Sequence, residues 1–212
     1  MIINNKIYKY IKKLIKKYEP KYLKKIKKNK LLKIYNNKNK ISNNLQGRFL
    51  SIISKIKKPK NILEIGTFLG YSTLCLSEGL KKKGILITIE KNKKYIYYAK
   101  KYFKKTKYYK KIKVIHGNAL NIIPKLKIYF DLIFIDADKI NYCKYFDLVI
   151  NKLNKNGIII TDNILWKGKI INKKLDFLTK KIYIYNEKIK KYKNIENIII
   201  PIRDGLNIIF KK

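Results

Sequence analysis

From Asn61 onward, short apolar runs alternate with stretches that carry a helical pattern. Each run is apolar almost throughout, which is typical of strands buried on both faces of a parallel sheet. Strands that alternate with helices connect through right-handed crossovers and form an α/β fold. The pattern therefore predicts an α/β fold whose first five strands are Ile62–Ile65, Ile85–Glu90, Ile112–His116, Phe130–Asp136 and Gly157–Asp162.

Two further apolar runs, Ile195–Ile200 and Leu206–Phe210, follow a helical stretch near residues 173–191. The segment Pro201–Gly205 separates them, and its proline and glycine suit a turn between antiparallel strands. A closing antiparallel hairpin is therefore predicted.

Residues 1–57 carry apolar side chains at helical spacing among many lysines, and Glu19-Pro20 interrupts the pattern. Two or three amphipathic helices are predicted. Such basic helices can bind a membrane surface or pack on a core, and packing is the preferred interpretation. No repeat or linker is evident, so we expect one domain, residues 1–212, with a helical cap at 1–57. The apolar positions of the cap include Ile7, Ile11, Leu14, Ile15, Leu23, Ile26 and Leu31.

The charge of the chain is extreme: 53 Lys and Arg face 13 Asp and Glu, a net charge of +40. Such a charge normally indicates a polyanion as partner. However, only Arg48 and Arg203 are arginines, and Lys, Ile, Asn and Tyr, which A and T alone can encode, make up 133 of 212 residues. Drift toward A and T at solvated positions explains the lysines, and nucleic-acid binding stays open.

Histidine and cysteine are scarce, which excludes several kinds of site. His116 is the single histidine, so a zinc site with two histidines is impossible. Cys75 and Cys143 lie far apart, which indicates neither a disulfide framework nor a thiolate metal site and favours a reducing compartment. No run approaches the ~18 apolar residues of a membrane span, so we expect a cytoplasmic protein without a membrane partner.

The first predicted strand runs into a glycine-containing turn at residues 64–72. Glycine lets the backbone approach a ligand closely, and Ser72 with the start of the next helix offers donors. Phe68 stands where a dinucleotide fingerprint has its second glycine, which disfavours a pyrophosphate. Glu90 ends the next strand, 24 residues after Gly66, where an acid can accept both ribose hydroxyls. The pair predicts a nucleoside cofactor without a pyrophosphate.

The third strand ends in His116-Gly-Asn-Ala119, where an adenine edge would lie. Asn118 either hydrogen-bonds the base or caps the next helix, and both interpretations stay open. We assign no role to His116.

Oxygen-bearing side chains follow the fourth and fifth strands. Asp136, Asp162 and Asn163 are expected to converge because adjacent parallel strands end at the same edge of the sheet. Oxygen donors without His or Cys favour Mg²⁺, Mn²⁺ or Ca²⁺; the alternative is that the acids cap helices. Lys139, three residues after Asp136, is placed to take a proton from a metal-bound hydroxyl.

Four ordered motifs resemble the cation-dependent class I O-methyltransferases, which include catechol and caffeoyl-CoA O-methyltransferases and bacterial relatives that methylate 5-hydroxyuridine in tRNA. The resemblance runs from about Asn43 to the C-terminus. The motifs are Leu63-Glu-Ile-Gly-Thr-Phe-Leu-Gly-Tyr-Ser72, Phe134-Ile-Asp-Ala-Asp-Lys139, Asp162-Asn-Ile-Leu-Trp-Lys-Gly168 and Pro201-Ile-Arg-Asp-Gly205.

The resemblance implies a Rossmann-like class I methyltransferase fold, with seven strands of which the last is antiparallel, and a homodimer. It also implies S-adenosylmethionine as cofactor and a divalent metal, with Lys139 as the base. The residues implied around the methionine part are Glu64, Gly66 and Ser72; Glu90 holds the ribose, Ala119 and Asp138 lie near the adenosine, and Tyr145 and Asp136 border the cofactor. The implied metal ligands are Asp136, Asp162 and Asn163.

Two positions depart from this pattern. Asn118 stands where relatives usually have an acid that meets adenine, which weakens the expected cofactor affinity. Arg203 stands where relatives often have glycine, a change that a turn tolerates.

The combined interpretation is methyl transfer to a metal-chelated hydroxyl. A 5-hydroxyuridine in tRNA is the favoured acceptor, because a basic surface attracts RNA phosphates. A small catechol-like phenol is the alternative. A non-catalytic basic RNA-binding protein is a third possibility, which the intact set Asp136, Lys139, Asp162 and Asn163 disfavours.

Overall fold

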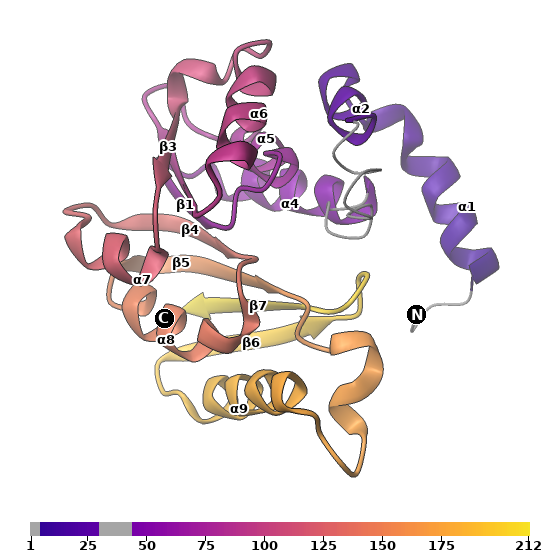
Figure 1. Cartoon of the computed structure of the whole chain (residues 1–212), viewed down its shortest axis with the longest axis vertical. Helices are drawn as coiled ribbons and strands as arrows, with labels where there is room; N and C mark the ends of the chain where they lie inside the picture. The colour runs from indigo at the N-terminus through magenta and orange to yellow at the C-terminus, as the bar shows by residue number, and fades with distance from the viewer. Residues whose placement is uncertain (1–4, 30–43) are drawn as a thin grey trace.

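A computed structural model describes residues 5–29 and 44–212 of the chain. Its centre is a seven-stranded sheet in the order β3-β2-β1-β4-β5-β7-β6 (Figure 1). From β1 the chain first builds the sheet in one direction, through β2 and β3, and then in the other, through β4 and β5. The sheet therefore has a switch point between β1 and β4, the place where open α/β sheets bind ligands. The strands are β1 Asn61–Ile65, β2 Ile85–Glu90, β3 Ile112–His116, β4 Phe130–Ile135, β5 Leu153–Asp162, β6 Ile195–Ile200 and β7 Leu206–Lys211.

The direction of the strands confirms the predicted α/β topology. All pairings among β1 to β5 are parallel, whereas β7 is antiparallel to both β5 and β6. The last strand alone therefore runs against the others, and β6 and β7 form the predicted hairpin.

Helices cover both faces of the sheet. Consecutive residues of one strand therefore pack into two different apolar clusters, one on each face. Ile62 belongs to an apolar cluster with residues of α2, α4, α5 and α6, whereas Leu63 belongs to a second cluster with residues of α7, α8 and α9. The helices are α1 Asn5–Ile15, α2 Lys21–Lys27, α4 Asn44–Lys57, α5 Tyr71–Ser77, α6 Lys93–Phe103, α7 Ala119–Ile122, α8 Tyr142–Ile150 and α9 Phe177–Lys191, and the short 3-10 turns are η1 Lys16–Tyr18, η3 Tyr109–Lys111, η4 Ile123–Lys125, η5 Lys139–Asn141 and η6 Trp166–Ile171.

Five predicted boundaries were wrong, two of them by a single added residue, since β1 begins at Asn61 and β7 ends at Lys211. β5 begins at Leu153 rather than Gly157, because the polar residues 154–156 hide its start and a register irregularity opposite Phe130 absorbs them. β4 ends at Ile135, one residue early. The last helix begins at Phe177, where the side chain of Asp176 accepts the Thr179 amide and caps it.

The predicted packing of the N-terminal helices holds for α2 and for α4, whose Leu50 is fully buried, but only weakly for α1. Leu23 and Ile26 of α2 are fully buried. By contrast, Ile7 and Leu14 of α1 are 55% and 51% exposed, so this helix buries little of its apolar side. Leu31 lies outside the described residues. Within the described ranges, no helix is long and apolar enough to cross a membrane.

A buried ion pair ties α4 to the end of α5. Arg48 binds Glu78 through two nitrogens, at 2.7 and 3.0 Å, and Ser51 donates to the same carboxylate at 2.7 Å. Lys55 adds a second cation at 2.9 Å. Burial alone would raise the pKa of Glu78, but the donors from Arg48, Ser51 and Lys55 lower it to about 2.

We expect Glu78→Gln to lower the free energy of unfolding by ~3 kcal/mol near neutral pH, because it leaves the Arg48 guanidinium buried without its carboxylate. The pKa of Glu78 is about 2 in the folded chain and ordinarily 4.5. Its stabilisation is therefore complete above about pH 4.5 and disappears as the pH falls toward 2. Urea unfolding at several pH values measures this difference.

The matched control is Glu196→Gln, since the Glu196 side chain is 70% exposed in its pair with Lys212 and should matter little. A gap between wild type and Glu78→Gln that stays constant from pH 6 down to pH 3 would contradict the assignment.

Candidate active site

The carboxyl ends of β1 and β4 approach each other at Gly66. The Asp136 amide donates to the Ile65 carbonyl at 2.9 Å, and the Gly66 amide donates to the Ile89 carbonyl at 3.0 Å. Gly66 has φ +100°, and a Cβ there would lie 2.3 Å from the Asp136 carbonyl oxygen. Glycine is therefore required here, and it brings the first turn directly beside Asp136.

Glu64 is fully buried behind this turn. Its carboxylate accepts hydroxyl hydrogen bonds from Ser72 and Thr88, both at 2.6 Å, and from Thr73. Burial raises the pKa of Glu64 to about 7, although these donors oppose the rise. The structure thus places Glu64 against the start of α5, where it fixes Ser72 rather than facing solvent.

Glu90 organises the turn at the end of β1. Its two carboxylate oxygens accept the backbone amides of Phe68, at 2.8 Å, and Asn92, at 2.9 Å. Phe68 has φ +48°, which is unusual for a residue other than glycine. Glu90 therefore already holds the loop that Gly66 begins, and it stays partly exposed at the sheet edge.

The segment after β3 supports the capping interpretation of Asn118. Its side chain accepts the Leu120 amide at 3.1 Å, and it is the N-cap of α7. Ala119 is the first residue of α7 and is 4% exposed. The His116 ring contacts the Lys91 carbonyl at 3.0 Å, away from the acidic cluster, in line with its having no assigned role.

Asp138 and Tyr145 form a pair beyond β4. The Tyr145 hydroxyl donates to Asp138 at 2.6 Å, and Asn141 donates to the other oxygen. Burial would raise the pKa of Asp138, but these two donors and Lys91 lower it. Tyr145 is fully buried, so its hydroxyl meets the site through Asp138.

Lys139 lies at the start of η5, directly beside the end of β4. Its Nζ is 2.9 Å from Asp136 Oδ1, and the two side chains keep 12% and 19% exposure. The same Nζ lies 5.1 Å from the centre of the Tyr142 ring. The predicted base and the predicted metal ligand are therefore brought together and remain accessible.

Asp162 is the last residue of β5, and Asn163 follows it at the carboxyl ends of the parallel strands. Asp162 is fully buried, its Oδ1 accepts the Asn163 amide at 2.7 Å, and the Tyr142 hydroxyl donates to its carbonyl at 2.9 Å. Burial and, next, the charge of Asp136 raise the pKa of Asp162 to about 7. Asn163 has φ +61°, which turns the chain sharply after the strand.

Two residues beside Asp162 were not predicted as part of the site: Gln46 belongs to no recognised motif, and Arg203 was expected only as a change that a turn tolerates. Gln46 donates to Asp162 Oδ2 at 2.7 Å, Arg203 donates to Gln46 Oε1 at 2.9 Å, and the Arg203 guanidinium lies 3.7 Å from Asp162 Oδ2. A signal for Arg203 was present, because it is one of only two arginines among 53 cationic residues. The other, Arg48, is also buried in an ion pair.

The donor set fits a hard cation. Within residues 5–29 and 44–212, no group of three or more His, Cys, Asp or Glu side chains could hold a metal. The candidate set is two carboxylates and an amide, and burial together with the charge of Asp136 raises the pKa of Asp162. Neither Asp136 nor Asp162 caps a helix in the described contacts, so the alternative role as helix caps is disfavoured for them.

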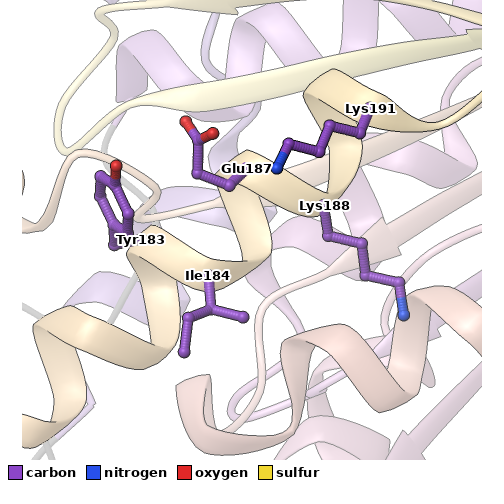
Figure 2. Close-up of a pocket in the computed structure, with 5 residues that line it drawn as sticks. All are labelled: Tyr183, Ile184, Glu187, Lys188 and Lys191. Carbon is purple, nitrogen blue, oxygen red and sulfur yellow. The ribbon is translucent and has the colours of Figure 1, made fainter.

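A surface depression lies elsewhere, on the outer side of α9 (Figure 2). Tyr183, Ile184, Glu187, Lys188 and Lys191 line it, all from one helix. None of the predicted site residues contributes to it. The chemistry-bearing residues gather instead at the carboxyl ends of β1, β2, β4 and β5.

Comparison with known proteins gives consistent matches. A family model described as "O-methyltransferase" matches residues 13–212. The catechol O-methyltransferase of Niastella koreensis is 36% identical over 60% of this chain and 59% of its own length, so the match spans less than two thirds of that relative. The caffeoyl-CoA O-methyltransferase 1 of Eucalyptus globulus is 30% identical over 77% of this chain and 71% of its own length.

Solved structures agree over nearly the whole chain. The SAH-bound methyltransferase PaMTH1 of Podospora anserina has 27% identity and a TM-score of 0.86, covering 100% of this chain and 98% of that one. The O-methyltransferase of Bacillus cereus in complex with SAH has 27% identity and a TM-score of 0.81, covering 92% of each chain.

We expect Gly66→Ala to lower the free energy of unfolding by ~3 kcal/mol, because a Cβ adds strain at positive φ and collides with backbone rather than with a movable side chain. Guanidinium unfolding measures the loss.

Gly168→Ala is the matched control: Gly168 has φ +78°, but a Cβ there meets nothing within 4 Å. It should show the conformational strain alone, about 1 kcal/mol. Equal losses for the two variants would contradict the proposed close approach of β1 and β4.

Proposed function

The chain belongs to the O-methyltransferase family, and on that premise we propose that it transfers the methyl group of S-adenosylmethionine to a hydroxyl of a small catechol-like phenol. The observation that carries the proposal is the convergence of Asp136, Lys139 and Asp162 beside the glycine turn of β1. Cofactor, metal and base are thus proposed to meet at one edge of the sheet.

The cofactor proposal rests on the two related structures that carry SAH, the demethylated form of S-adenosylmethionine. Gly66 and Ser72 would border its methionine part, with Glu64 acting through Ser72. Glu90 would accept the ribose hydroxyls. Asp138, held by Tyr145, and Ala119 would lie along the adenosine.

Asp136, Asp162 and Asn163 would hold a divalent cation of the Mg²⁺ type, since all three offer oxygen. Such a cation supplies Lewis acidity that makes a chelated hydroxyl easier to deprotonate.

The residues of the chain account for the proton and the charge. In its neutral form, Lys139 accepts the hydroxyl proton on Nζ, and the carboxylate of Asp136, 2.9 Å away, stabilises the ammonium that results. The acceptor oxygen then forms a bond to the methyl carbon as the carbon–sulfur bond breaks, leaving a neutral thioether and an aryl methyl ether. Aligning the oxygen behind the methyl carbon is the main contribution of the site.

The comparisons favour a small phenol over the tRNA base that sequence analysis preferred. The relatives are named for catechol and caffeoyl-CoA, and none of those reported above is named for tRNA. The basic surface has an independent explanation in the lysine-rich composition, so it lends the tRNA acceptor little weight. A homodimer and a cytoplasmic location stay predictions.

We expect Glu90→Ala to weaken S-adenosylmethionine binding by about 1–3 kcal/mol, the scale for losing hydrogen bonds to a charged group. Part of the loss comes from the Phe68 loop, which Glu90 holds. Isothermal titration calorimetry measures the affinity.

Glu187→Ala removes an acid from the α9 depression of Figure 2 and should leave the affinity unchanged. Loss of binding in Glu187→Ala but not in Glu90→Ala would indicate that the cofactor binds at α9 and not at the sheet edge.

For the acceptor, we expect labelled methyl from S-adenosylmethionine to appear in a catechol in the presence of Mg²⁺ and to disappear with EDTA. Lys139→Ala should lower kcat/KM by ~10²–10⁴-fold, the usual contribution of a general base. Asp162→Ala should prevent rescue of EDTA-treated enzyme by Mg²⁺ while leaving cofactor binding intact.

tRNA bearing 5-hydroxyuridine serves as the competing acceptor in the same assay, with nucleoside mass spectrometry of the product. Label in 5-methoxyuridine with none in catechol would overturn the phenol assignment. Full activity in EDTA would remove the cation from the mechanism.

A further inference from the structure

Arg203 occupies a backbone position that disfavours it. Its φ is +59°, in the left-handed region where a residue with a Cβ pays about 1–2 kcal/mol relative to glycine. It lies in the turn between β6 and β7, where the carbonyls of Asp204 and Gly205 accept hydrogen bonds from the amides of Leu165 and Ile164. The cationic residues of this chain are almost all lysines, so an arginine at a strained position indicates that the contacts of its guanidinium are important.

The contacts of the guanidinium converge on one oxygen of Asp162. Gln46 donates to Oδ2 at 2.7 Å, and Arg203 both holds the Gln46 carbonyl at 2.9 Å and lies 3.7 Å from the same Oδ2. The other oxygen, Oδ1, accepts the adjacent Asn163 amide. Gln46 is fully buried and comes from α4, whereas Arg203 comes from the opposite end of the chain.

This arrangement treats the two carboxylate oxygens differently. Oδ2 carries a hydrogen bond from a side chain that is itself held in place, and a permanent positive charge stands beside it. A dication that approached Oδ2 would meet the guanidinium and be repelled. Oδ1 instead accepts a hydrogen bond from a neutral group, the Asn163 amide.

We propose that Gln46 and Arg203 are positioning residues that restrict Asp162 to binding a cation through Oδ1 alone, and that they thereby make the site select Mg²⁺ or Mn²⁺ over Ca²⁺. The proposal rests on the divalent cation of the proposed function. Mg²⁺ demands a compact octahedral shell, whereas Ca²⁺ takes more oxygens and readily accepts both oxygens of one carboxylate. Preventing two-oxygen coordination therefore penalises Ca²⁺ more than the smaller ions.

The test is cation binding without turnover. Mn²⁺ binding to the full chain is followed by electron paramagnetic resonance, and Ca²⁺ is titrated as competitor, for wild type, Arg203→Gly and Gln46→Met. Each variant should shift the ratio of Ca²⁺ to Mn²⁺ affinity toward Ca²⁺ by ~10-fold, the lower end of the effects of outer-shell partners on metal sites. Glycine removes the strain at φ +59°, and methionine nearly matches the shape of glutamine, so both variants should fold.

Lys58→Gly is the matched control. Lys58 is an exposed lysine at φ +47°. It lies shortly before β1, at the amino ends of the parallel strands and so away from the candidate site. The change therefore removes one charge and the same kind of strain. It should leave the ratio unchanged. Arg203→Lys keeps the charge but loses the planar fork, and it should restore part of the selectivity.

An unchanged Ca²⁺ to Mn²⁺ ratio in both Arg203→Gly and Gln46→Met would overturn the proposal, as would an equal shift in Lys58→Gly. Wild-type chain that binds S-adenosylmethionine but no Mn²⁺ would overturn it together with the metal, while leaving the cofactor assignment standing. Chain that binds Mn²⁺ with the predicted selectivity but no S-adenosylmethionine would instead reject the proposed function alone.

Discussion

The contact between the backbones of β1 and β4 at Gly66 is the constraint on which the candidate site depends. Only a residue without Cβ lets the first turn lie against the Asp136 carbonyl. That contact places the proposed cofactor side, at Ser72 and Glu90, next to the proposed metal side, at Asp136 and Lys139. Methyl transfer needs both halves within bonding reach, and a single backbone approach provides it.

Much of this could be predicted from the sequence because β1 to β5 are parallel. These strands are apolar along most of their length, so they were recognisable, and polar residues just beyond parallel strands had to meet at one edge. The start of β5 was missed because polar residues 154–156 sit within the strand. Gln46 was missed for a different reason: it lies 116 positions from Asp162, and no local pattern marks that contact.

Although the net charge is +40, the few acidic residues have specific structural roles. Glu78 holds Arg48 in the core, Asp131 accepts the Lys60 and Asn61 amides at the start of β1, and Asp176 caps α9. Each of these acids accepts hydrogen bonds from backbone amides or pairs with a buried cation, and a lysine side chain can do neither. The acids therefore fix the geometry, whereas the lysines mostly supply solvated surface, where self-repulsion is screened by salt.

The position of β7 also determines the order in which the last strands can join the sheet. It lies between β5 and β6, although it follows both in the chain, so β6 can join the sheet only through a strand that the ribosome delivers later. The turn that carries Arg203 closes when β7 pairs with β5, and only then does the guanidinium reach Gln46 at the other end of the sequence. A nascent chain that has completed β1 to β5 therefore holds the glycine turn and both carboxylates, yet the proposed cation site gains its Arg203 contact only after β6 and β7 have been made.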